Sequence, residues 1–311
     1  MRCIICRKEE IKGTDEHIIP DSLGGKLYYN NVCKKCNSLL GDKIDNYLTN
    51  SILVAFNRDR YNISGKKKKN FSWYDIMKFK TENGKKIKVR KDENKKLKYE
   101  IIEKIEENGK ITFIGESREK LYKMTKECLE RLGMNINEVE IREETIEKKI
   151  VLIGEKKENI YKIDLALLKI CFEFLMSKEE KYIEDEKGKK ISKLFYDYIQ
   201  IKKSETSFEK EEKVFTEIRK EVCDGIFFSK RKEIIEYIKY LIKPKLEKET
   251  VENNHIVAII YTGTETFVAV LLFFEIWGLY KLSNDSFGKS GCIIVRNDFV
   301  NKKVNTYNFL I

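Results

Sequence analysis

The 311-residue sequence contains only two prolines, Pro20 and Pro244, and only two histidines, His17 and His255. No proline-rich linker therefore marks a domain boundary. The longest apolar run, Phe267–Phe274, is far shorter than the roughly 20 residues that span a bilayer. We therefore expect a protein without a membrane partner.

The eight cysteines do not form the framework of a secreted, disulfide-rich protein. Four of them lie in two Cys-x-x-Cys pairs. The others are scattered singly, mostly in apolar surroundings: Cys128, Cys171, Cys223 and Cys292. This usage is typical of metal thiolates and buried thiols in a reducing compartment. The chain enters its first cysteine pair at once, so we expect no signal peptide and a soluble, cytoplasmic protein.

The formal net charge of +11 is concentrated just after the cysteine pairs. Residues 51–100 contain 16 lysines and arginines against six acidic residues. Such a block favours a phosphate backbone as ligand, because neutralised phosphates release counterions. The candidate nucleic-acid contacts are four consecutive lysines, Lys66, Lys67, Lys68 and Lys69. A charged linker in front of ordinary core aromatics would give the same pattern, and both interpretations stay open.

Two matched Cys-x-x-Cys pairs are a strong signal for zinc. A two-residue gap lets one turn present two thiolates, and Zn²⁺ takes four ligands in a tetrahedron. The 26 residues between the pairs exceed the 15 to 20 of common zinc ribbons. That surplus leaves room for a hairpin with other chemistry. We predict a structural zinc site formed by Cys3, Cys6, Cys33 and Cys36.

The residues between and after the two pairs predict the order strand, turn, strand, helix. Residues 14–20 contain Ile18 and Ile19 and end at Pro20, which stops strand pairing. Two glycines then permit a reversal before a returning strand at residues 26–29. Leucines and isoleucines recur at helical spacing over residues 37–48. We expect Ile44, Asp45 and the nearby leucines to pack this helix against the hairpin.

The same stretch contains the parts needed for phosphodiester hydrolysis. His17 follows Asp15 and Glu16, and Asn37 comes directly after the last paired cysteine. A neutral imidazole can take a proton from water near pH 7. A carboxylate and an amide oxygen together can hold a hard cation such as Mg²⁺. A lone histidine is more often structural, so the argument depends on the whole set.

Several spaced elements then agree with a known family. The stretches CIIC, EHIIP, LGG, VCKKCN and LGDKID resemble the HNH endonucleases, and within them the zinc-bearing members with Asn in place of the last His. The resemblance covers roughly residues 1–48. It implies an α+β fold that begins with a ββα-metal (His-Me) finger containing the four-cysteine zinc site.

The resemblance also implies roles for individual residues. His17 takes the position of the general base, and Glu16 that of the metal-binding acid, where the family often has Asp. Asn37 takes the position of the second metal ligand. The middle Asn of the family, which orients the loop and the base, corresponds to Asn31 or Asn30.

The whole chain is predicted to contain four parts. They are an HNH nuclease domain with zinc knuckles at 1–56, a basic linker at 57–70, a small α+β unit at 71–155, and a helical layer plus antiparallel sheet at 156–311. Helical patterns occupy 117–132, 160–175, 190–201 and 230–242. Strand patterns occupy 86–90, 97–102, 110–114, 255–261, 266–274 and 292–296. The C-terminal part is expected to regulate the nuclease or select its DNA.

The leading hypothesis is a metal-dependent endonuclease that hydrolyses DNA in restriction or anti-phage defence. Its cofactors would be structural Zn²⁺ and catalytic Mg²⁺ or Mn²⁺, and we expect its DNA to be double-stranded. One alternative is an HNH effector activated by a nucleotide second messenger through the C-terminal domain. Another is a non-catalytic zinc-binding DNA module. A homodimer and a nucleotide effector stay open as further partners.

Overall fold

The computed structural model describes residues 1–9, 12–63, 72–82, 84, 86–91, 97–100, 103–107, 110–114, 118–135, 152–202, 204, 207–223, 225–245 and 253–310. These form two compact units. One joins Met1–Phe71 to Glu158–Ile311, and the other is Ser72–Lys157. The N-terminal segment, residues 1–63, thus shares a unit with the C-terminal segment, residues 158–310. The fold class is mixed α+β, as the sequence predicts, while its domain boundaries stay predictions.

The N-terminal segment begins with an antiparallel pair of strands. Strand β1 (Gly13–His17) pairs with β2 (Tyr28–Cys33), so that Gly13 faces Cys33 and His17 faces Tyr28. The short turn η1 (Asp21–Leu23) lies between them. Ile18 and Ile19 follow β1 rather than belonging to it, and both are fully buried. The predicted first strand is therefore displaced toward the N-terminus, and its isoleucines serve as core residues.

A nearly continuous helical stretch follows β2. It consists of α1 (Lys34–Leu40), a π-helical turn η2 (Gly41–Asp45) and α2 (Asn46–Thr49), and α3 (Ile52–Arg60) comes next. Leu40, Ile44 and Leu48 are completely buried on its inner face. A π turn adds a residue to the helical turn and so changes which side chains share a face. Here it ends at Asp45.

The C-terminal segment starts with helices. The long α5 (Ile160–Lys178) is buried over most of its surface, in agreement with its nearly all-round apolar sequence. It is followed by η5 (Glu180–Glu184), α6 (Glu186–Gln200), α7 (Ser207–Val222), α8 (Gly225–Ile242) and η6 (Lys243–Lys245). None of the helices in the described residues is long and apolar enough to cross a bilayer.

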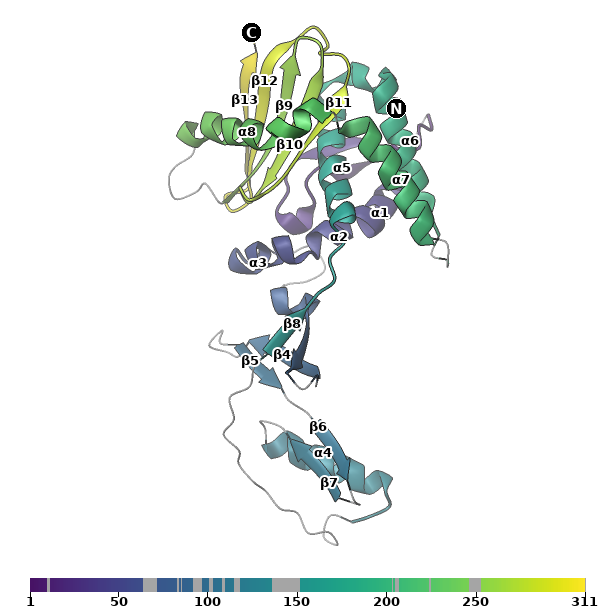
Figure 1. Cartoon of the computed structure of the whole chain (residues 1–311), viewed down its shortest axis with the longest axis vertical. Coiled ribbons are helices and arrows are strands. Elements are labelled where there is room, and N and C mark those ends of the chain that lie inside the picture. Colours follow the sequence, from purple (N-terminus) through teal and green to yellow (C-terminus); the bar gives the residue numbers. More distant parts are fainter. Residues whose placement is uncertain are drawn as a thin grey trace. The chain divides into compact units, whose positions relative to one another are not determined.

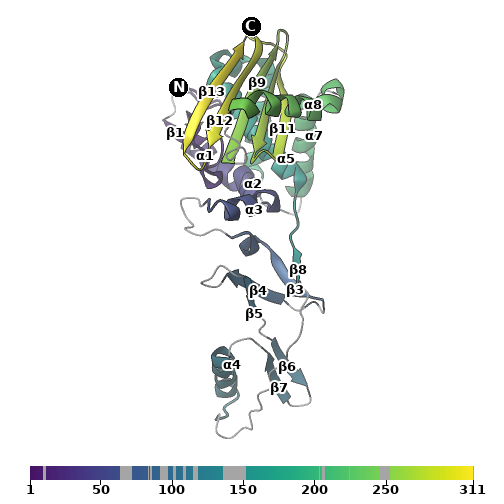
Figure 2. The ribbon, with the colours of Figure 1, turned by 90° about the vertical axis from the view of Figure 1, so that its left-hand side faces the viewer.

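A five-stranded antiparallel sheet completes this unit. Its strands are β9 (Asn254–Thr262), β10 (Thr266–Leu272), β11 (Ile276–Ser283), β12 (Ser290–Asp298) and β13 (Lys303–Leu310), in the spatial order β11-β10-β9-β12-β13. The sheet lies between α5 and α8 (Figure 1), and Figure 2 shows β13 at one edge and β11 at the other. The predicted β9–β10 hairpin is present, closed by a hydrogen bond from Thr262 N to Glu265 O.

Alternation along β9 explains how the sheet is covered on both faces. Val257 and Ile259 belong to a large core that also contains α5 and the buried residues of the N-terminal segment. Ile256 and Ala258 point to the other face and pack with Ile235 of α8. Successive side chains of a strand point to opposite faces, so one apolar strand serves two cores. The first of these cores joins the N-terminal hairpin and helices to the C-terminal sheet.

The second unit has its own small sheets. Strand β3 (Lys78–Thr81) lies between β4 (Lys86–Lys91) and β8 (Leu152–Glu155), and β4 pairs with β5 (Leu97–Glu100). Strands β6 (Glu103–Glu107) and β7 (Lys110–Ile114) form a hairpin beside α4 (Arg118–Arg131). The turn η3 (Trp73–Ile76) places the Trp73 ring 5.9 Å from that of Phe79. These aromatics pack within the unit.

Candidate functional site

The four paired cysteines come together as predicted. Their Sγ atoms all lie within 4.8 Å of one another, and the Cys6 and Cys33 sulfurs are 3.9 Å apart. Four thiolates around zinc at about 2.3 Å would have sulfurs about 3.8 Å apart, by tetrahedral geometry. The first pair lies in the N-terminal turn and the second at the start of α1. The cluster therefore fits a zinc ion that clamps the turn to the helix.

The thiols of this cluster are not equivalent. A hydrogen bond from Cys36 lowers the pKa of the Cys3 thiol to about 4, and the same interaction raises the pKa of Cys36. The backbone N–H of Cys33 also donates to Cys3 Sγ, at 3.4 Å. The thiolate is the form that binds metal. One ligand is thus already favoured as a thiolate.

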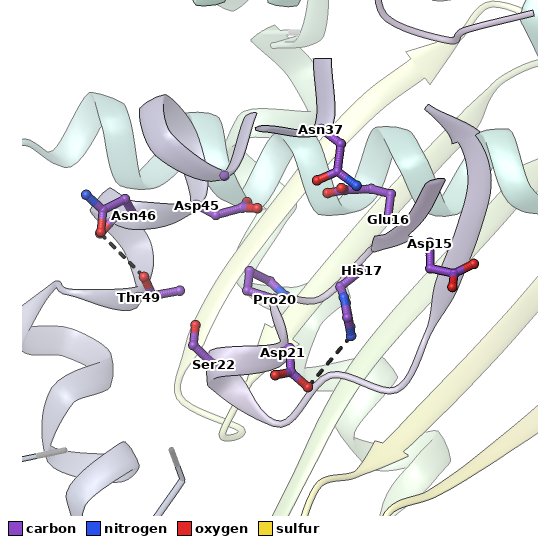
Figure 3. A pocket seen from close by; sticks show the side chains of 11 residues that line it. Asp15, Glu16, His17, Pro20, Asp21, Ser22, Asn37, Asp45, Asn46 and Thr49 are labelled. Carbon is purple, nitrogen blue, oxygen red and sulfur yellow. Dashed lines mark hydrogen bonds and ion pairs between the residues drawn. The ribbon is translucent and has the colours of Figure 1, made fainter. Parts of the chain in front are cut away.

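A second feature of the N-terminal segment is a cavity of about 220 Å³ beside the hairpin. It is lined almost entirely by polar side chains. The predicted His17, Glu16 and Asn37 all contribute to its wall (Figure 3). The other lining residues are Asp15, Pro20, Asp21, Ser22, Gly41, Asp45, Asn46 and Thr49. Residues 20 positions apart in the sequence therefore meet at one polar hollow.

His17 is held at the end of β1 by its neighbours. Its ring centroid is 4.5 Å from that of Tyr28, its cross-strand partner, and its Nε2 is 3.7 Å from Asp21 Oδ1. The separation from Asp21 is longer than a hydrogen bond but close enough for electrostatic attraction. The side chain is 16% exposed. Tyr28 and Asp21 therefore help to orient the imidazole while it faces the cavity.

The hydrogen bonds of Asn37 determine which end of its amide faces the cavity. The Thr14 hydroxyl donates to the Val32 carbonyl at 2.9 Å, which uses its only proton. The same hydroxyl oxygen accepts from Asn37 Nδ2 at 2.9 Å. Asn37 must therefore present its NH₂ group to β1. Its carbonyl oxygen, a ligand for hard cations, remains for the cavity.

Glu16 has a partner that the sequence did not predict. Its carboxylate is 3% exposed and accepts a hydrogen bond from Lys169 Nζ of α5, at 2.5 Å. The same ammonium lies 3.0 Å from Asp45 Oδ2 and 3.3 Å from Glu173 Oε2. The available signal was a pair of charged residues, Lys169 and Glu173, four positions apart in the most apolar stretch of the helix, because such residues are rarely buried unless they are paired.

The electrostatics of this cluster follow from its burial. Burial raises the pKa of Asp45 to about 6, although Lys169 opposes that effect. Burial likewise raises the pKa of Glu173 well above its usual value. Burial alone would lower the pKa of Lys169, but the surrounding carboxylates of Asp45, Glu16 and Glu173 raise it well above normal. Lys169 is therefore charged.

Asp45 was expected to pack the helix, but it lines the cavity instead. The π turn brings its carboxylate toward Glu16 and Asn37, and Figure 3 shows these three side chains converging. Its Oδ1 is buried, and no hydrogen-bond partner reaches it among the described residues. An orphaned carboxylate oxygen beside another carboxylate and an amide oxygen suits a hydrated divalent cation. Glu16, Asn37 and Asp45 thus fit such an ion.

The remaining candidates do not join this cavity. Neither Asn30 nor Asn31 is among its lining residues. Asn31 instead accepts a backbone hydrogen bond from Ile4 N at 2.9 Å, which ties the first cysteine turn to β2. The four lysines Lys66, Lys67, Lys68 and Lys69 lie outside the described residues.

A comparison with known protein families finds a match in this part of the chain. Residues 3–53 match the family model described as HNH endonuclease. This N-terminal segment belongs to the HNH endonuclease family. We call the matched residues 3–53 the HNH segment. This segment includes all four paired cysteines, the predicted general base and every predicted metal ligand. An HNH domain indicates nuclease activity on a nucleic acid with a divalent metal. No curated protein and no solved structure matched the chain.

Proposed function

We propose that this protein is a metal-dependent DNA endonuclease whose active site is the polar cavity of the HNH segment. The observation that supports the proposal is the convergence of His17, Glu16 and Asn37 on one hollow beside a four-cysteine cluster. The strand, strand, helix order of β1, β2 and α1 supports the ββα-metal finger expected from the family resemblance.

Each side chain has a role that its surroundings favour. His17 takes a proton from the attacking water, with its ring kept in place by Tyr28 and Asp21. Glu16 and the Asn37 carbonyl oxygen hold the divalent cation, Mg²⁺ or Mn²⁺. When bound, such a cation stabilises the leaving oxygen of the phosphodiester. The thiolate cluster, with zinc, keeps the first turn and α1 together.

Further parts of the proposal concern the substrate and the setting. Asn31, or Asn30, would support the loop that presents the base. Lys66, Lys67, Lys68 and Lys69 would contact the phosphate backbone of double-stranded DNA. A nuclease that is joined so closely to a larger C-terminal segment suits a controlled role in restriction or anti-phage defence.

A plasmid-cleavage assay with Mg²⁺ or Mn²⁺ tests the mechanism. His17→Ala and Glu16→Gln should each lower the cleavage rate by about 10²-fold or more. Asp42→Asn is the matched control, because Asp42 is an exposed acid on the same helical stretch and does not line the cavity. Zinc content and circular dichroism would show that all variants are folded. If His17→Ala cut as fast as the parent protein, the proposed mechanism would be wrong.

The same assay separates the alternatives. Adding cyclic oligonucleotides should not be required for cleavage if the enzyme acts alone. Cleavage only in their presence would instead support an effector activated by a second messenger. Retention of DNA without cleavage under any divalent metal would support a non-catalytic binding module.

A further inference from the structure

One lysine of the C-terminal segment lies at the centre of the acidic wall described above. The side chain of Lys169 is completely buried, and its ammonium contacts the carboxylates of Glu16, Asp45 and Glu173. Glu16 belongs to β1 and Asp45 to the π turn, whereas the lysine belongs to α5. A single ammonium therefore connects the two sides of the cavity wall to a distant helix.

Lys169 binds one oxygen of each of the two carboxylates that line the cavity. Its Nζ donates hydrogen bonds to Glu16 Oε1 and to Asp45 Oδ2. The second oxygen of Asp45 has no hydrogen-bond partner among the described residues, and both acids line the cavity. One oxygen of each carboxylate is thus fixed by the lysine. A carboxylate held at one oxygen can no longer rotate freely, so the direction of its other oxygen is set.

We infer that Lys169 is a positioning residue of the nuclease site, which fixes the carboxylates of Glu16 and Asp45 so that both present an oxygen to the same divalent cation. This inference rests on the proposed function, and it adds Asp45 to the cation ligands. The lysine is itself anchored, because it lies on α5, which is buried over most of its surface, and has Glu173 one turn away.

The balance of charge supports a cation at this position. On the cavity side, Glu16 and Asp45 offer two carboxylates to the single ammonium of Lys169. Buried charge is tolerated when it is compensated. A divalent cation on the cavity side of Glu16 and Asp45 would supply the missing compensation. The Lys169 ammonium is then the permanent, buried positive charge, and the divalent metal ion in the cavity is the positive charge that can exchange with solvent.

The test replaces the ammonium by an apolar side chain of similar length. For Lys169→Met, the maximal cleavage rate at saturating Mn²⁺ should fall by about 10²-fold, because small misplacements of ligands have effects of that size. Mn²⁺ should still bind at least as tightly, since a repelling charge has been removed. Lys162→Met is the matched control: Lys162 lies on the same helix and is ion-paired with Glu211, outside the cavity wall. It should cleave like the parent.

Lys169→Met alone leaves three buried acids without their partner, so a second variant guards against unfolding. In Lys169→Met/Glu173→Leu a buried ion pair is replaced by apolar side chains, which proteins often tolerate well. This variant should fold like the parent by circular dichroism and show the same loss of maximal rate. An unchanged or increased maximal rate in this folded double variant would overturn the inference.

Mn²⁺ binding to the zinc-loaded protein, followed by electron paramagnetic resonance, separates this inference from the proposed function. If the parent protein bound Mn²⁺ but cleaved no DNA, the proposed function would fail. The inference that Lys169 positions Glu16 and Asp45 as cation ligands would then be decided by Mn²⁺ binding alone. Asp45→Asn should weaken Mn²⁺ binding by about tenfold, whereas Asp42→Asn should not. Equal Mn²⁺ binding by the parent and Asp45→Asn would overturn it.

Discussion

Acid should destabilise the unit that contains the HNH segment through one buried histidine. His255 is the second residue of β9, is completely buried, and lies against the rings of Phe273 and Phe299. Its Nε2 contacts the Leu23 carbonyl at 2.8 Å, and its Nδ1 accepts from the Phe273 N–H at 3.3 Å. Both nitrogens are satisfied only by the neutral ring with its proton on Nε2. A second proton would face the N–H of Phe273.

The magnitude follows from the depressed pKa. Burial lowers the pKa of His255 to about 4, although the Leu23 carbonyl opposes this, whereas an unfolded histidine titrates near 6.5. Well above pH 6.5 the ring is neutral in both states, so its titration does not change the free energy of unfolding. As the pH falls below 6.5, the unfolded state takes up the proton first, so stability is lost at about 1.4 kcal/mol per pH unit. The loss is about 2 kcal/mol at pH 5 and about 3 kcal/mol at pH 4.

The measurement compares the parent protein with His255→Gln. A glutamine can donate to the Leu23 carbonyl and accept from the Phe273 N–H, but it does not titrate. Free energies of unfolding from urea titrations between pH 7.5 and 4.5 should therefore fall more steeply for the parent. Other titrating groups, including the thiolates, contribute equally to both proteins and cancel in the difference. Parallel curves for the two proteins would refute the reasoning.

Three further predictions concern the HNH segment. Purified protein should contain about one zinc ion per chain by atomic absorption, and Cys36→Ser should lose it and unfold at a lower temperature. Thr14→Val removes the acceptor of the Asn37 amide, so it should lower stability by about 1–2 kcal/mol in denaturant titrations and reduce cleavage. Gly25→Ala should lower stability by about 3 kcal/mol, because the added Cβ would lie 1.8 Å from the Ile19 carbonyl oxygen. Gly41→Ala is its control, since that Cβ meets nothing within 4 Å.

The zinc cluster could be predicted from the sequence because its signal is local. A two-residue gap fixes the distance between two thiols, and two such pairs leave few other arrangements. The placement of His17 and Asn37 at one cavity also followed from local order, because a hairpin clamped to a helix has little freedom. Their roles in catalysis stay predictions.

Elements with weak apolar patterns were missed. Helix α7 is mostly charged, and its buried residues, such as Ile218 and Val222, form only a narrow stripe. Strand β13 lies at a sheet edge with most of its residues exposed, so its alternation has little contrast. Strand β11 contains Gly278, which weakens a strand pattern. In each case the secondary structure is determined by tertiary packing and not by the local propensity of the sequence.

The parts of the site that the sequence did not reveal depend on contacts between distant residues. The Lys169–Glu16 pair joins residues 153 positions apart, and no local spacing encodes such a contact. Asp45 was missed for a different reason. A regular helix would have placed it by simple periodicity, but the π turn at Gly41–Asp45 changes the phase of the helix just there.

The same long-range contacts explain why the HNH segment and the sheet form one unit. The Asn297 side chain of β12 accepts from Lys26 N at 2.8 Å and donates to the Gly24 carbonyl at 3.2 Å. His255 of β9 holds the Leu23 carbonyl of the same turn. This turn begins at Asp21, which orients the His17 ring. The sheet therefore fixes the base from one side while Lys169 fixes the acids from the other, so any signal that moves the C-terminal segment would reach both halves of the proposed active site.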